Sequence, residues 1–154
     1  MRRARKFLFL SFNEKLLLFK ATVLVFTSRV ALALLPFQIV RRFLSRVARA
    51  SRTRQYQQSD VDKIVWATAA AVRRLPGFGT CLTQAMTAYV LLARIGLETD
   101  LRIGVTRNDE GKFVAHAWLQ KGDRILIGEL GEDLDRYTPF PALKGLERQT
   151  RSVK

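Results

Sequence analysis

The chain has 154 residues, one cysteine, one histidine and a formal net charge of +14. This length fits one domain with a real hydrophobic core. The single cysteine excludes an internal disulfide framework and fits a reducing, cytoplasmic compartment, and one His with one Cys argues against a protein-only metal site.

The positive charge is concentrated in the first third of the chain. Residues 1–54 contain thirteen Lys and Arg and the single acid Glu14, a net of +12, and the remaining residues contribute only +2. The basic start imitates a signal peptide, but Asn13, Glu14 and Lys15 interrupt the apolar run and no convincing cleavage site follows before Lys20. The pattern therefore argues against secretion.

An apolar run follows, from Leu16 to Leu35. It contains two basic residues, so it is a poor candidate for a membrane-spanning helix. We expect instead one or two helices, roughly 12–34 and 36–49, broken near Pro36, because proline is disruptive beyond the first turn of a helix.

The second of these helices combines a basic face with apolar residues, namely Arg41, Arg42, Arg46 and Arg49 beside Phe43, Leu44 and Val47. Such a face fits an anionic membrane surface, a partner protein or acidic peptide, or a nucleic acid. It also fits a helical subdomain whose arginines are simply solvated. No nucleic-acid recognition motif is visible, which disfavours that partner.

A polar segment over residues 50–58 indicates a linker, and a further helix follows. Ser59 is its expected N-cap, Asp60 lies at the positive end of the helix, and Leu75 marks its end.

The only cysteine opens the next helix. Apolar residues at 82, 85, 86, 89, 90 and 92 have the helical period, Thr80 is a plausible N-cap and Gly96 a plausible stop. Cys81 then lies in the first turn, where the positive end of the helix dipole favours the nucleophilic thiolate. The alternative is that Cys81 is a small buried hydrophobic residue.

Beyond this helix, the sequence indicates an antiparallel meander. Residues 99–106 alternate as a strand, and the stretch from Asn108 to Gly111 reads as a turn. Strand-like runs over 113–120 and 124–129 then flank a two-residue turn at Gly122-Asp123.

The only histidine lies in the first of those two runs. If Lys121 pairs with Arg124 across the turn, His116 falls directly opposite Glu129, with Cβ atoms about 5 Å apart. Glu129 would then orient the imidazole while His116 deprotonates Cys81. A shift of one residue in the register would lose this pairing, and a structural histidine beside a solvated carboxylate is the alternative.

The order of a Cys helix, a His strand and an acid strand is that of the papain and transglutaminase-like active sites. More specifically, several separated motifs resemble the lasso-peptide leader peptidases in their stand-alone form. The motifs are Thr80-Cys81-Leu82, Leu91-Leu92-Ala93-Arg94-Ile95-Gly96-Leu97, Ile103-Gly104-Val105, Ala115-His116-Ala117-Trp118-Leu119 and Tyr137-Thr138-Pro139-Phe140. The resemblance covers about residues 60–140.

The resemblance implies a transglutaminase-like cysteine protease that removes the leader from a ribosomally made precursor peptide. It implies Cys81 as nucleophile, His116 as base and no cofactor. Glu129 is the best-placed third member and Asp123, in the predicted turn, is the alternative. The implied partners are the precursor, a separate small leader-recognition protein and an ATP-dependent cyclase that acts on the released core.

We therefore expect an α+β fold in which N-terminal helices precede a transglutaminase/papain-like core, with the Cys at a helix N-terminus and an antiparallel sheet. The expected regions are a basic helical region over 1–55, a catalytic core over 56–145 and a polar tail over 146–154. We expect a cytoplasmic protein, with peripheral membrane contact through its basic helices as an option. An acyltransferase and a non-catalytic basic adaptor of the same fold are the rival functions.

Overall fold

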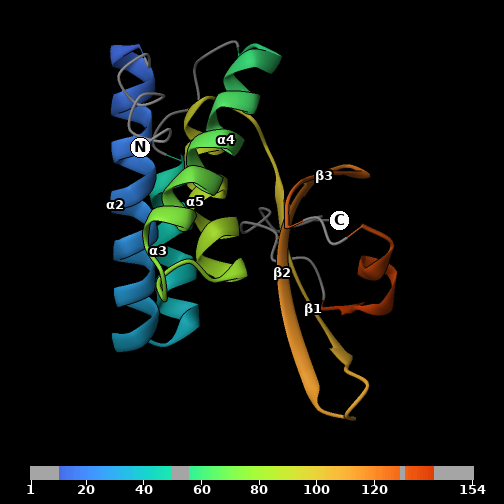
Figure 1. Ribbon diagram of the computed structural model, residues 1–154. Helices are drawn as coiled ribbons and strands as arrows, with labels where there is room; N and C mark the ends of the chain where they lie inside the picture. The colour runs from blue at the N-terminus through green and yellow to red at the C-terminus, as the bar shows by residue number, and fades with distance from the viewer. Residues whose placement is uncertain (1–10, 50–55, 129–130, 141–154) are drawn as a thin grey trace, which may run out of the picture.

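A layer of helices and an antiparallel sheet make up the computed structural model, which describes residues 11–49, 56–128 and 131–140 (Figure 1). The helices are α2 (Phe12–Leu34), α3 (Phe37–Arg49), α4 (Gln58–Arg74) and α5 (Cys81–Arg94). The strands are β1 (Asp100–Arg107), β2 (Phe113–Lys121), β3 (Arg124–Ile127) and β4 (Thr138–Pro139), with a 3₁₀ turn η1 (Gly131–Arg136) before β4. The predicted α+β fold is confirmed.

The first N-terminal helix has the predicted bounds, the second begins one residue later than predicted, at Phe37, and the break lies near Pro36 as expected. Ser11 caps α2: its backbone N–H donates to the Glu14 carboxylate at 2.8 Å, and its hydroxyl accepts from the Glu14 N–H at 3.3 Å. The backbone N–H and then the hydroxyl of Ser11 lower the pKa of the Glu14 carboxyl. The single acid of the N-terminal region is therefore committed to a helix cap.

The third helix begins earlier than predicted. Its N-cap is Gln57, whose N–H donates to the Asp60 carboxylate at 3.1 Å. Ser59 lies inside the first turn, so its prediction as N-cap was wrong. The predicted position of Asp60 at the positive end of the helix is confirmed.

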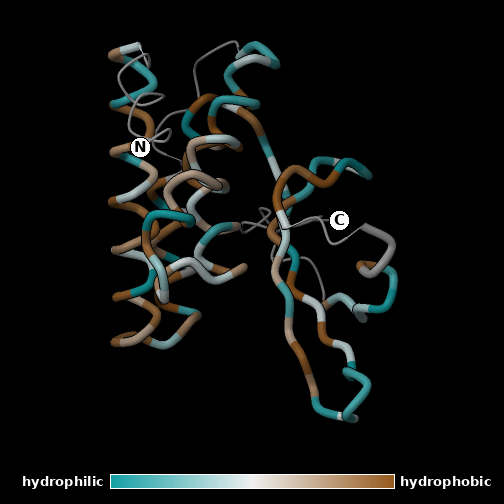
Figure 2. Tube along the Cα trace, viewed as in Figure 1, coloured by the Kyte–Doolittle hydropathy of each residue, from teal (hydrophilic) through white to brown (hydrophobic). Residues whose placement is uncertain are grey.

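The core is formed where α2 packs on α4, where α2, α3 and α4 pack on α5, and where α5 packs on β2. Figure 2 shows apolar residues along these helices and at the middle of the sheet. Fully buried side chains include Val25 of α2, Met86 and Leu92 of α5 and Leu119 of β2. The helix that starts at Cys81 is thus surrounded by the other elements, which fixes its direction.

One described helix, α2, is long and apolar enough to cross a membrane. Core helices of soluble proteins and signal sequences share that length and composition, so these two properties assign no location to the chain.

The sheet has the strand order β3-β2-β1-β4, and each neighbouring pair is antiparallel. Gly111 and Gly122 have φ of 75° and 55° in the two hairpin turns, a backbone conformation that glycine adopts without strain. The predicted meander from β1 to β3 is confirmed. The two-residue strand β4 joins the far edge next to β1, where a proline is tolerated.

The register between β2 and β3 departs from the prediction. Lys121 pairs with Arg124 and Gln120 with Ile125, as expected, but a bulge follows and Leu119 pairs with Ile127. The extra residue in β3 shifts the pairing by one position beyond the bulge. The expectation of one constant register along the hairpin was therefore wrong, and Glu129, the predicted partner of His116, lies outside the described residues.

Candidate active site

The Cys81 side chain belongs to the first residue of α5. Thr80 is the N-cap, as predicted, and its hydroxyl accepts the N–H of Thr83 at 3.2 Å. Gly96, with φ of 88°, lies just past the C-terminal end of the helix, also as predicted. Cys81 is half-buried and packs against the hydrophobic core. A thiol at this position lies beside the backbone N–H groups of the first helical turn, which have no carbonyl partner within the helix.

A buried hydroxyl holds the chain that enters this helix. Thr83 is fully buried, and its Oγ1 accepts the Thr80 N–H at 2.9 Å. The same oxygen lies 3.0 Å from the carbonyl oxygens of Phe78 and of Thr80, either of which can accept its proton. The sequence pattern gave no sign of this role for Thr83, because a capping box usually has Glu or Gln three residues after the cap.

The approach to Cys81 is also held against α4. A Cβ at Gly79 would collide with the Val72 side chain, so this position requires glycine. The loop before the thiol therefore lies in direct contact with α4.

The imidazole of His116 is held by a backbone carbonyl. Its Nε2 lies 2.9 Å from the carbonyl oxygen of Gly128. A carbonyl oxygen only accepts, so Nε2 must carry the proton, and Nδ1 of the neutral ring is left with its lone pair. Nδ1 is therefore the atom of His116 that can act as a base.

Aromatic rings flank His116. Trp118 lies nearly parallel to it, with ring centres 6.4 Å apart, and Tyr137 is tilted at 5.6 Å. Gly104 pairs with His116 across β1 and β2, and a Cβ there would lie 3.0 Å from Trp118 and from Tyr137. The glycine thus makes room for the rings that fix the plane of the imidazole.

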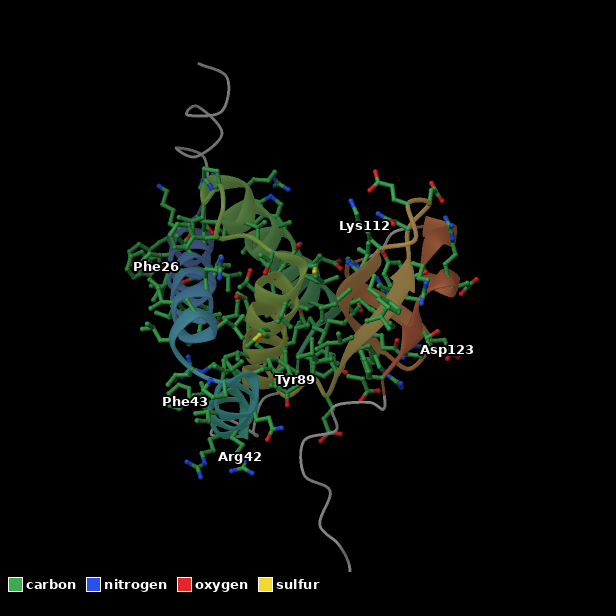
Figure 3. All side chains as sticks on the ribbon, turned by 90° about the horizontal axis from the view of Figure 1, so that it is seen from below. Phe26, Arg42, Phe43, Tyr89, Lys112 and Asp123 are labelled. Atoms are coloured by element: carbon green, nitrogen blue, oxygen red, sulfur yellow. The ribbon has the colours of Figure 1, made fainter. Side chains whose placement is uncertain are left out.

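Of the two acids considered as the third member of a triad, Asp123 is the one that the structure describes. It is exposed in the turn between β2 and β3, at the sheet side of the molecule (Figure 3). The five residues from His116 to Lys121 span roughly 17 Å of strand, so Asp123 lies far from the imidazole. Glu129 lies outside the described residues, directly after Gly128.

Cys81 and His116 belong to neighbouring elements, since α5 packs on β2. No hydrogen bond joins the thiol to the imidazole, both of which are among the described residues. Ala117 and Leu119 join the core that includes α5, whereas alternation along the strand puts His116 and Trp118 on the other face of β2. The structure thus brings His116 together with Gly128, Trp118 and Tyr137, and leaves Cys81 in a separate setting.

The described residues contain no cluster of three His, Cys, Asp or Glu side chains that could hold a metal ion.

Comparison with known proteins decides the family. A model described as "Transglutaminase-like superfamily" matches residues 22–142, which includes α5, the sheet and most of α2. The chain belongs to the transglutaminase-like superfamily. This superfamily includes cysteine proteases and acyltransferases. No curated protein and no solved structure matches the chain.

A cysteine at a helix start and a histidine on the following sheet are the parts that a thiol acyl-transfer reaction needs. The superfamily match also begins within α2, so this helix is part of the matched domain.

Proposed function

We propose that the chain is a cysteine peptidase that removes the leader from a lasso-peptide precursor. The observation that carries the proposal is the position of its only cysteine, at the capped start of α5 in a transglutaminase-like domain. The order and spacing of the five sequence motifs support the finer assignment to leader removal. A precursor peptide, a separate small leader-recognition protein and the ATP-dependent cyclase are the proposed partners.

In the proposed reaction, Nδ1 of His116 accepts the proton of Cys81, and the thiolate attacks the carbonyl carbon of the scissile peptide bond. The backbone N–H of Cys81 stabilises the oxyanion that forms. Collapse of this intermediate expels the amine of the core peptide, which takes the proton from His116, and leaves a thioester on Cys81. Water then hydrolyses the thioester and releases the leader as a carboxylate. His116 lies on the face of β2 away from the core around α5, so this first step requires a rearrangement that brings the imidazole to the thiol.

The carbonyl of Gly128 supports this role for His116, since it holds the tautomer with the proton on Nε2. We propose Glu129, which follows Gly128 directly, as the acid that stabilises the imidazolium once it forms. Asp123 is disfavoured by its exposed position in the turn.

The direct test is to incubate the protein with a lasso-peptide precursor and its leader-recognition protein, and to identify the products by mass spectrometry. We expect a free leader and a core with a new N-terminus. Cys81→Ala and His116→Ala should each lower the rate by at least about a thousandfold, because each removes a group that makes or breaks bonds. Both variants should keep the far-ultraviolet circular dichroism of the parent. If Cys81→Ala still cleaved the precursor, the assignment of Cys81 as the nucleophile would be wrong.

The same assay separates the rival functions. Transfer of the acyl group to an added amine, with no hydrolysis, would assign an acyltransferase. Binding of the precursor with neither reaction, and no labelling of Cys81 by a thiol-directed electrophile at neutral pH, would assign a non-catalytic adaptor.

Glu129→Gln tests the third member. We expect the rate of cleavage to fall roughly 10- to 100-fold. Where a carboxylate alone fixes the tautomer of the histidine, its loss lowers the rate roughly 10⁴-fold; the loss here should be smaller because the Gly128 carbonyl also holds His116. Asp123→Asn is the matched control and should be as active as the parent. Equal activity of Glu129→Gln and the parent would remove Glu129 from the mechanism.

A further inference from the structure

Seven large apolar side chains form a continuous exposed stripe along α2, from its first residue to its last. This outer stripe consists of Phe12, Leu16, Phe19, Val23, Phe26, Val30 and Leu34. At about 100° per residue, all seven lie within about 40° of one direction. Phe12 and Leu34, at its two ends, are 80% and 76% exposed. The stripe is therefore a surface feature about the length of the helix, roughly 33 Å.

The second N-terminal helix extends this surface. Leu35, Ile39 and Phe43 are also exposed, Phe43 by 65%. Figure 3 shows Phe26 and Phe43 on the side of the helices that faces away from the sheet. The apolar surface thus covers the face of the molecule opposite the strand that carries His116.

Basic side chains border the outer stripe on both sides. By helical position, Lys15 and Arg29 lie along one flank and Lys20 along the other. Arg42 and Arg46 of α3 are exposed next to Phe43 in the sequence. The single acid between residues 1 and 54, Glu14, is occupied by the Ser11 cap. An apolar surface with a positive border favours a partner that is apolar within and negative at its surface.

One polar group beside the outer stripe is satisfied within the helix. Thr27 is exposed, yet its hydroxyl donates to the Val23 carbonyl at 2.8 Å. A hydroxyl bonded to its own helix can enter an apolar medium without losing a water partner. This arrangement suits a lipid better than a protein interface, whose rim is polar.

The inner face of α2 fixes the orientation of the helix. Leu18, Ala21, Val25 and Ser28 are buried against the rest of the domain, and α2 packs on both α4 and α5. The helix can cross a bilayer only by leaving this core, whereas it can lie in the plane of the interface with the domain intact.

We propose that the outer stripe and its basic border bind the surface of an anionic phospholipid membrane, with α2 lying in the membrane plane. A second copy of the chain is disfavoured because the basic borders of the two copies would face each other. An acidic protein would satisfy the basic border but not the length of uninterrupted apolar surface.

One pair of stacked rings connects the outer stripe to the loop before α5. Phe26 of the outer stripe stacks on Phe78 with ring centres 5.3 Å apart, and the Phe78 carbonyl lies 3.0 Å from the Thr83 hydroxyl. The bound protein would turn its sheet toward the solvent, where a peptide substrate can reach it.

The test is flotation of the full chain with vesicles, which needs no substrate and is independent of peptidase activity. Vesicles of phosphatidylglycerol and phosphatidylcholine in equal parts are compared with pure phosphatidylcholine at 50 and 500 mM NaCl. We expect flotation with the anionic vesicles, roughly tenfold weaker at the higher salt because surface attraction is screened. Release of the bound protein by alkaline carbonate is expected for a helix that does not span.

Phe19→Ser and Phe113→Ser form a matched pair, since the two rings are 65% and 71% exposed on opposite layers of the molecule. Phe19→Ser should lower the vesicle partition coefficient roughly tenfold, because it removes one large ring from the apolar contact. Phe113→Ser should leave the coefficient unchanged. Circular dichroism melting curves of both should match the parent.

Several outcomes would overturn the proposal. They are no flotation with anionic vesicles at low salt, equal flotation of Phe19→Ser and the parent, and resistance to carbonate. A dimer in light scattering that Phe19→Ser dissociates, without flotation, would assign the stripe to a second copy. Salt-sensitive binding to polyglutamate without flotation would assign the basic border to an acidic protein.

Discussion

Two buried threonines on α5, Thr83 and Thr87, have opposite surroundings. The Thr83 hydroxyl has hydrogen-bond partners on the loop before the helix, whereas the Thr87 hydroxyl is buried with no hydrogen-bond partner among the described residues. A buried hydroxyl without a partner lowers stability, and one that caps a helix raises it. The first turn of α5, which positions Cys81, therefore depends on Thr83.

Replacing each threonine by valine tests this difference with side chains of nearly equal shape. Thr83→Val should lower the free energy of unfolding by about 2 kcal/mol, because it leaves backbone groups at the helix start unsatisfied. It should also change the rate at which Cys81 is alkylated, because the loop before Cys81 becomes looser. Thr87→Val should be neutral or stabilise the protein by up to about 1 kcal/mol. Urea denaturation measures both, and equal effects of the two substitutions would contradict the role of Thr83.

At the scale of elements, the hairpin of β2 and β3 joins a regular turn to an irregular end. The turn at Gly122 sets the pairing of Lys121 with Arg124, and the bulge between Leu119 and Gln120 then shifts it. Beyond the bulge, Gly128 adopts φ of 85°, and its carbonyl reaches His116. The position of the imidazole is thus set by backbone geometry at the end of β3.

Gly128→Ala tests this geometry, with Gly122→Ala as the control, since both glycines have positive φ. An added Cβ at Gly128 would lie 2.8 Å from the Ala117 carbonyl oxygen, whereas nothing lies within 4 Å at Gly122. Gly122→Ala should cost only the backbone strain, about 1 kcal/mol. Gly128→Ala should cost more and should displace the carbonyl that holds His116.

Long-range ¹H–¹⁵N NMR of the His116 ring gives the direct measurement. The parent and Gly122→Ala should show the proton on Nε2, and Gly128→Ala should show a mixture of tautomers. An unchanged tautomer in Gly128→Ala would mean that the carbonyl does not control the ring.

The same hairpin shows what the sequence could and could not predict. The turn was predictable because glycine and aspartate next to each other mark it. The helix over 12–34 and the helix after Pro36 were predictable from apolar runs and from the proline between them. The bulge was not, because an extra residue in a strand leaves no mark in an apolar pattern. The role of the Gly128 carbonyl was missed for a related reason: backbone acceptors are present at every residue, so only the folded geometry selects one.

At the scale of the whole molecule, α2 contributes one face to the core and the other to the outer surface. Its inner face supplies Ala21 and Val25, both fully buried, to the core around α5. Its outer face carries the apolar stripe. The helix therefore links the proposed membrane surface to the layer that presents Cys81, and the stability of the fold should depend on one face of α2 only.

Aspartate substitutions at Val25 and Val23 separate these two roles. Val25 is fully buried and Val23 is 42% exposed. Val25→Asp puts an unpaired carboxylate into the core and should lower stability by several kcal/mol, enough to unfold a small domain. Val23→Asp should keep the cooperative thermal transition, because its carboxylate remains in water. It should abolish flotation with anionic vesicles, because it puts a negative charge in the middle of the outer stripe. A folded Val25→Asp variant would show that α2 detaches from the core without loss of the fold, and the helix would then be able to enter a membrane by itself.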